Sequence, residues 1–380
     1  MKRLWILLGL CVAFCGCDDE DNTQKYEDFY IFGDLSEADR TQLPVSAVKS
    51  IDAAGLYPSD MAMDGDDVLI VDSGNNAINR LNLEDLSLEK AYVDLGQNAS
   101  PYAVWVDSEN LYVALQGTTK TVQSYSRANP DEMTTLEADW IAPTAVISNQ
   151  DAIFVADSEY DYTAPTDSKS GKIYRFDKSG NVTATMTTTA QNPGFLDLIE
   201  VNGENYLIAV DAGIITFGET TVPPKTSCVD FWKLSTLSQE MTAPVAIYCL
   251  ENASLGRTAV VDQTLYIGDA LRPVVHTLSL DSLKTDRREM GEIAILEGET
   301  LGLTTPLNVA DTLVVFNYND STMMWFGGDE TLRIRLTPSS EVYKGPIDAL
   351  YDAVRRQIVI LNSGSGSLDI LSTQTQKTKN

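Results

Sequence analysis

The chain has 380 residues, of which 55 are acidic and 27 basic, so its formal net charge at pH 7 is −28. A surface this acidic repels nucleic acids and anionic lipid headgroups, which excludes functions that depend on binding either. An acidic surface can attract a cation or a basic partner, but solubility alone is sufficient to explain it.

The first 16 residues predict an export signal. Lys2 and Arg3 precede the apolar stretch 4–14, which is shorter than the roughly 20 residues that span a bilayer. No later stretch of the sequence approaches a membrane-spanning length. We therefore expect residues 1–16 to be a signal peptide that is removed on export.

The junction at Cys17 resembles a bacterial lipoprotein signal, in which a small residue, here Gly16, precedes the cysteine that becomes lipidated. The resemblance implies attachment to the membrane through a lipid on Cys17 only. Residues 17–27 then form an acidic tether, and the protein resides in the bacterial cell envelope, either periplasmic or surface-exposed. The alternative is plain secretion with cleavage nearby.

Short apolar runs recur seven times within residues 28–372. They begin at residues 68, 111, 153, 207, 265, 313 and 358. Each run is apolar on both faces, as expected of a strand that is buried on both sides. A turn containing Pro or Gly lies upstream of each run, near residues 58, 101, 143, 193, 256, 302 and 346, and more polar strands follow it. This period predicts an all-β, seven-bladed β-propeller, with residues 373–380 as a polar tail.

The last unit lacks an outer strand, because only the polar tail follows the strand at 367–371. The segment 45–51 precedes the first unit and has strand character. We expect this N-terminal strand to pair with the last blade and close the ring, which removes an open sheet edge.

The sequences VLIVDSGNNAINRL (68–81) and PYAVWVDSENLYVA (101–114) resemble NHL- and YVTN-type propeller repeats. The resemblance covers roughly residues 53–372 and is clearest in the first three units. It implies the propeller fold and an extracytoplasmic setting, but these families serve many functions.

Cys228 begins one predicted strand and Cys249 ends the next. Antiparallel pairing about the polar turn at 235–240 brings the two cysteines opposite each other. The sequence therefore predicts a disulfide across this hairpin, as suits an exported protein.

A short polar side chain follows the second strand in six of the seven units. These residues are Asp72, Asp157, Asp211, Asp269, Asn317 and Asn362. One interpretation is that each hydrogen-bonds the backbone of the adjacent turn. The other is a ring around the central channel that holds Ca²⁺ through oxygen ligands, and the sequence does not decide between them.

The third and fourth units carry long insertions, 158–171 and 212–227. Equivalent loops of adjacent blades emerge on one face, so the two insertions are expected to form a partner-binding surface. The candidate contact residues are Tyr160, Asp161, Tyr162, Asp167, Thr216, Phe217 and Glu219. The alternative is that these loops are surface segments without a partner.

No reaction is indicated by the sequence. His276 is the only histidine, which excludes a multi-histidine zinc site, and no haem, P-loop or dinucleotide motif is present. We predict a monomeric, lipid-anchored propeller that binds an envelope protein or a small ligand, with no cofactor except a possible Ca²⁺ and no nucleic acid. The alternative is a divalent-metal-dependent hydrolase that resembles the gluconolactonases, with its site in the channel.

Overall fold

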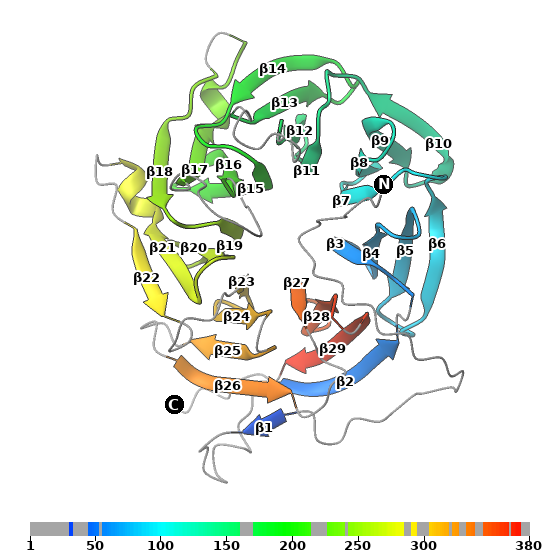
Figure 1. The fold of residues 1–380 in the computed structure, drawn as a ribbon, viewed down its shortest axis with the longest axis vertical. Coiled ribbons are helices and arrows are strands. Elements are labelled where there is room, and N and C mark those ends of the chain that lie inside the picture. The colour runs from blue at the N-terminus through cyan, green and yellow to red at the C-terminus, as the bar shows by residue number, and fades with distance from the viewer. Residues whose placement is uncertain are drawn as a thin grey trace, which may run out of the picture.

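The computed structural model describes residues 30–32, 45–52, 55–159, 170–213, 226–239, 242–284, 290–294, 304–318, 321–326, 332–338, 345–364 and 366–373. Seven small antiparallel sheets surround one axis, as Figure 1 shows, and this confirms the predicted seven-bladed β-propeller. The described helical structure is limited to two short 3₁₀ segments, η2 (Leu234–Thr236) and η3 (Leu280–Lys284).

The first three blades each contain four strands that follow one another from the axis outward (Figure 1). Blade 1 consists of β3 (Pro58–Asp64), β4 (Asp67–Asp72), β5 (Ala77–Asn82) and β6 (Leu88–Asp94). Blade 2 consists of β7 (Pro101–Val106), β8 (Asn110–Gln116), β9 (Lys120–Ser126) and β10 (Asn129–Leu136). Blade 3 consists of β11 (Pro143–Ser148), β12 (Ala152–Asp157), β13 (Lys172–Asp177) and β14 (Val182–Thr187).

The next two blades repeat this order. Blade 4 consists of β15 (Pro193–Val201), β16 (Glu204–Asp211), β17 (Thr226–Lys233) and β18 (Ala246–Glu251). Blade 5 consists of β19 (Leu255–Val261), β20 (Thr264–Asp269), β21 (Val274–Ser279) and β22 (Gly291–Ala294).

The last two blades include the N-terminal strands. Blade 6 consists of β23 (Thr304–Asn308), β24 (Leu313–Asn317), β25 (Met323–Phe326) and β26 (Leu332–Pro338), and β1 (Tyr30–Phe32) pairs with β26 as a fifth strand. Blade 7 consists of β27 (Pro346–Asp352), β28 (Gln357–Asn362), β29 (Ser367–Thr373) and β2 (Val45–Asp52).

The second strand of each blade is the most deeply buried part of the fold. In β4, all four residues from Val68 to Val71 are fully buried. Their alternate side chains enter different clusters, because Leu69 packs with residues of blade 2 whereas Val68 packs with residues of blade 7. Burial on both faces explains why these strands are uniformly apolar.

Ring closure occurs as predicted, by antiparallel pairing of β2 with β29. The register runs from Val45 opposite Thr373 to Asp52 opposite Ser367. Ile51 of β2 is buried in the cluster between blades 7 and 1, so the closing strand contributes to the core as well as to the hydrogen-bond ladder. The pairing of β1 with blade 6 is an addition that the repeat pattern does not indicate.

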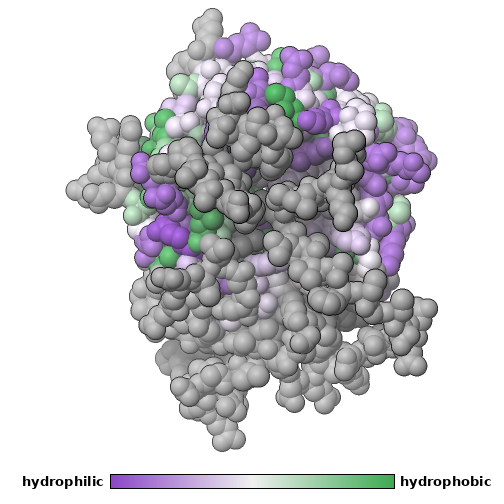
Figure 2. Space-filling view, viewed as in Figure 1, coloured by the Kyte–Doolittle hydropathy of each residue, from purple (hydrophilic) through white to green (hydrophobic). Residues whose placement is uncertain are grey.

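The outer strands form a polar rim. Six of the eight residues of β10 are exposed. Figure 2, which has the orientation of Figure 1, shows that the described part of the rim is mostly hydrophilic. In the part of the chain that the structure describes, no helix has the length and hydropathy of a membrane span.

Deleting residues 30–52 is expected to lower the melting temperature by at least about 10 °C, because blade 7 loses its outer strand and Ile51 leaves the core. Thermal unfolding followed by circular dichroism measures this change. Deleting residues 18–29, which retains both N-terminal strands, is the control. Equal melting temperatures for the two deletions would contradict the closure.

Candidate functional site

The first strands of the seven blades, β3, β7, β11, β15, β19, β23 and β27, surround the axis of the ring (Figure 1). In six of them, β23 being the exception, the pairing with the second strand shifts by one residue near the start of the strand. In blade 1, for example, Pro58 is opposite Asp72 but Asp60 is opposite Val71. Such a bulge bends the strand and redirects the next side chains.

Three charged residues at these bulges meet at the axis. Arg257 Nη2 lies 2.5 Å from Asp60 Oδ1 and 2.8 Å from Asp348 Oδ2. The three residues belong to blades 5, 1 and 7, and blade 6 separates blade 5 from blade 7. A single guanidinium therefore reaches across the centre of the ring and joins blades that are not neighbours.

Further contacts hold this arrangement in place. Asp60 Oδ2 accepts the backbone N–H of Val104 in blade 2 at 2.9 Å. The Arg257 guanidinium carbon lies 5.3 Å from the centre of the Phe195 ring in blade 4, within the range of a cation–π contact. The Arg257 side chain remains 28 % exposed, so solvent reaches the cluster.

Asp197 adds a third carboxyl group to the first strands. Its Oδ2 accepts the Thr258 hydroxyl at 3.0 Å, and Thr258 is the neighbour of Arg257. Burial raises the pKa of Asp197, and the hydrogen bonds that it accepts oppose this only in part. We define Asp60, Asp197, Arg257 and Asp348 as the channel cluster, whose three carboxyl groups outnumber its one guanidinium.

Asp348 is the most deeply buried acid of the channel cluster. Its side chain is 1 % exposed, and its Oδ2 lies close to Arg257 without a well-directed hydrogen bond. Burial raises the pKa of Asp348 to about 7, since the attraction of Arg257 is insufficient to offset desolvation and the repulsion of Asp60. Around neutral pH, the charge of the channel cluster thus depends on proton uptake by Asp348.

The predicted ring of Asp72, Asp157, Asp211, Asp269, Asn317 and Asn362 occupies the ends of the second strands, where all six residues are buried. Asp157 illustrates their contacts, because its carboxylate accepts backbone N–H groups of Ile141, Ala142 and Glu159. These bonds tie the turn before the first strand to the end of the second. Among the described residues, no three His, Cys, Asp or Glu side chains are grouped as metal ligands.

The predicted disulfide is present. Cys228 and Cys249 are directly opposite in the β17–β18 register and are joined by an S–S bond of 2.04 Å. The proposed loop contacts Tyr160, Asp161, Tyr162, Asp167, Thr216, Phe217 and Glu219 lie outside the described residues, as do residues 1–16 and Cys17 with its tether.

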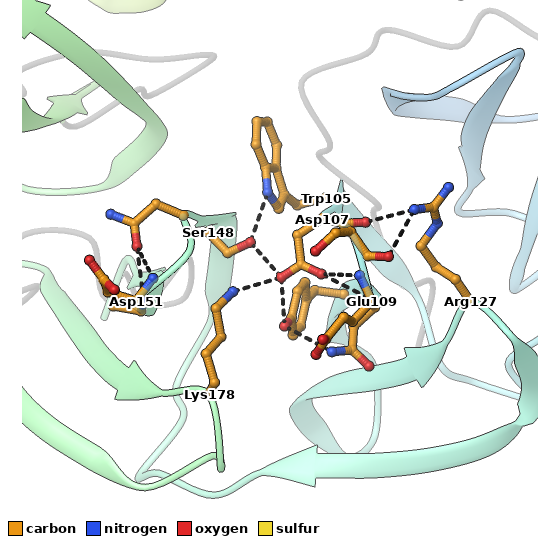
Figure 3. Close-up of polar contacts among 12 residues, drawn as sticks. Trp105, Asp107, Glu109, Arg127, Ser148, Asp151 and Lys178 are labelled. Atoms are coloured by element: carbon orange, nitrogen blue, oxygen red, sulfur yellow. Dashed lines mark hydrogen bonds and ion pairs between the residues drawn. The ribbon is translucent and has the colours of Figure 1, made fainter.

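A second polar network lies at the opposite end of the strands, at the turn after β7 (Figure 3). Asp107 Oδ2 lies 2.7 Å from Lys178 Nζ and accepts the hydroxyls of Ser148 and Tyr112 at 3.0 and 3.1 Å. Ser148 in turn accepts the indole N–H of Trp105. Ser148 and Lys178 belong to blade 3, so this network joins blades 2 and 3.

The charges of this second network are balanced. Burial raises the pKa of Asp107, but the hydrogen bonds from Lys178, Ser148 and two backbone N–H groups outweigh it and lower the pKa to about 2. Arg127 binds Asp64 of blade 1 and the Asp107 carbonyl, which repeats the link between blades. A network with satisfied charges that joins adjacent blades has a structural role.

Sequence reasoning did not find the channel cluster. A signal was nevertheless present, because the residue two positions after the proline of the turn is Asp60 in the first unit and Asp348 in the seventh, whereas it is Ala103 and Ala145 in the second and third. Arg257 directly follows the turn glycine, Gly256, of the fifth unit. A charge in a strand next to the axis has no place in a purely apolar core. Its convergence with charges of distant blades becomes visible only in the closed ring.

The fold and this site define the class of the protein as a seven-bladed β-propeller with a charged cluster at its axis. No family model and no curated protein matches the chain. It is similar in fold to a streptogramin B lyase at 10 % identity, with a TM-score of 0.59 and coverage of 87 % of this chain and 97 % of the lyase chain.

Two further solved structures show the same fold. One is a catalytically inactive histidine-to-alanine variant of virginiamycin B lyase from Staphylococcus aureus with quinupristin, at 9 % identity and a TM-score of 0.62, covering 85 % of this chain and 98 % of that chain. The other is a chain of the mitotic checkpoint complex, at 10 % identity and a TM-score of 0.65, covering 95 % of this chain and 98 % of that chain. A lyase and a checkpoint assembly share this architecture, so the similarity establishes the fold alone.

The raised pKa of Asp348 predicts a specific pH dependence of stability. Between the ordinary carboxyl pKa of 3.8 and about 7, the folded state keeps a proton that the unfolded state releases. The free energy of unfolding should therefore fall as pH rises through this window, and fall less steeply in Asp348→Asn. Urea unfolding across the window measures both slopes, and identical slopes would refute the assignment.

Proposed function

We propose that the protein is a lipid-anchored binding propeller of the bacterial cell envelope, which takes a cationic amine or guanidinium group at its axis. The observation that carries this proposal is the excess of carboxyl groups over cations in the channel cluster. Arg257 shows the chemistry of recognition within the protein itself, since its guanidinium lies between two carboxylates and beside an aromatic ring.

The topology supports a ligand site at this end of the ring. In the antiparallel blades, the start of each first strand is opposite the end of the second, as Pro143 is opposite Asp157 and Pro193 is opposite Asp211. The two long connections that follow β12 and β16 therefore begin at the end where the channel cluster lies. Long connections on a rigid scaffold are frequent sites of binding.

The buried position of the single histidine does not support a catalytic role such as that of the lyase. The inactive S. aureus lyase variant has a histidine replaced by alanine. The only histidine here, His276, is 1 % exposed, and its Nε2 lies 3.0 Å from Asp269 Oδ2 within blade 5. It is a buried partner of a structural aspartate, so we propose binding without catalysis.

Binding of a polyamine such as spermidine is expected to be saturable and to weaken about tenfold in Asp348→Asn, because the variant removes one carboxylate from the site. In the wild type, affinity should be higher one pH unit above the Asp348 pKa of about 7 than one unit below it. Isothermal titration calorimetry measures both effects, and Asp348→Asn should lose the pH dependence.

Asp131→Asn is the matched control for this experiment, because it removes the same charge from the exposed outer strand β10. Equal affinities of the two variants for spermidine would attribute the binding to net charge and overturn the axial site. Stabilisation by Ca²⁺ that Asp348→Asn abolishes, without any response to amines, would instead favour the metal-dependent hydrolase.

The envelope location depends on Cys17. Cys17→Ser should move the protein from the membrane fraction to the soluble fraction, because the lipid would be its only membrane attachment. Fractionation and the mass of the mature N-terminus measure this change. Retention of the variant in the membrane fraction would contradict a lipid anchor at this residue.

A further inference from the structure

A polar pair recurs between the second and third strands of several blades. In blade 1, Asn79 donates to Asp72 at 3.3 Å, and in blade 7, Asn362 donates to Asp369 at 2.7 Å. In blade 5, the Asp269 carboxylate lies 3.0 Å from the imidazole of His276. Each of these buried pairs joins an acid to a group that can donate a hydrogen bond.

Blade 4 has two acids in this place. Asp211 ends β16 opposite Cys228, and Asp230 lies two residues after Cys228 in β17. Asp72 and Asn79 have the same relation in blade 1, where Asp72 is opposite Ala77. Asp211 and Asp230 are both 0 % exposed. Blade 4 therefore has an acid at both positions, whereas each of the other three blades has one acid and one hydrogen-bond donor.

Both carboxyl groups are only half satisfied. Asp211 Oδ2 accepts the N–H of Ala190 at 2.9 Å, and Asp230 Oδ2 accepts the N–H of Thr189 at 2.6 Å. The Oδ1 atom of each is buried and has no hydrogen-bond partner. Among the described residues, no basic side chain forms an ion pair with either carboxyl group, so nothing described compensates their charge.

Two uncompensated carboxylates cannot remain in a dry interior, because desolvation of each ion is worth several kcal/mol. Burial raises the pKa of both acids, and the proximity of Asp230 adds to the shift of Asp211. A single shared proton would leave one buried negative charge, and a proton on each acid would leave a buried hydroxyl with no described acceptor outside the pair. A divalent cation neutralises both groups and gives each free Oδ1 atom a partner.

We propose that Asp211 and Asp230 bind a Ca²⁺ ion inside blade 4. The side chains of Thr188 and Thr189, which contact Asp211 and Asp230 respectively, add hydroxyl oxygens to an all-oxygen donor set. Full burial favours Ca²⁺ over Mg²⁺, since Mg²⁺ retains several water ligands.

The bound ion would hold three parts of the chain together. Thr188 and Thr189 belong to the connection between β14 of blade 3 and β15 of blade 4, whereas the two acids belong to β16 and β17. The disulfide at Cys228 joins β17 to β18 beside the same site. The site is thus a structural cross-link of blade 4 and is separate from the channel cluster.

The test uses the full mature chain and Ca²⁺ itself as the probe. The melting temperature should rise in millimolar CaCl₂, fall in EDTA, and respond less to MgCl₂. Asp230→Asn recreates the acid–amide pair of blade 1 and should fold without Ca²⁺, with a melting temperature that is the same in CaCl₂ and EDTA. Calorimetry of the wild type should give one site per chain that Asp230→Asn lacks.

Two controls distinguish this site from others. Asp348→Asn and Asp131→Asn should both keep the full Ca²⁺ response, and its loss in Asp348→Asn would place the ion at the axis and overturn the proposal. A wild-type melting temperature that is equal in EDTA and CaCl₂ would also overturn it. A pH-dependent stability that Asp230→Asn abolishes would then identify a shared proton in place of the ion.

Discussion

The burial of the second strand on both faces is the constraint on which this structure depends. A strand such as Val68–Val71 has no polar face, so each blade needs a neighbour on either side. No blade can satisfy this requirement alone, and a row of blades leaves two unprotected faces at its ends. Closure of the ring by β2 is therefore part of the core rather than an accessory.

The same packing explains why the axis carries charge. The ring converges on the first strands, whose inner edge has no further blade to pack against (Figure 1). Near the bulges, charged side chains such as Arg257 and Asp348 meet across the centre at little cost to the packing between blades. Because one guanidinium faces several carboxyl groups, electrostatic balance among the described residues at the axis is incomplete, and a ligand can complete it.

Local features of the sequence predicted much of the fold. They did not predict the sites, because the sites depend on contacts between distant parts of the chain. The apolar runs, the closing segment 45–51 and the opposition of Cys228 and Cys249 follow from alternation and turn position, so they could be inferred. The meeting of Asp60 with Arg257 requires knowledge of the closed ring. The Asp211–Asp230 pair is hidden by the insertion between β16 and β17, which removes the seven-residue spacing that Asp72 and Asn79 keep.

The joining of the first strands to the last blade has a consequence for biosynthesis. β2 and β29 are separated by roughly 320 residues, so β2 has no partner until almost the whole chain has left the ribosome. If the chain crosses a membrane N-terminus first, β2 remains unpaired on the far side until β29 has also crossed. During that interval the ring has an open sheet edge, which can pair with other chains.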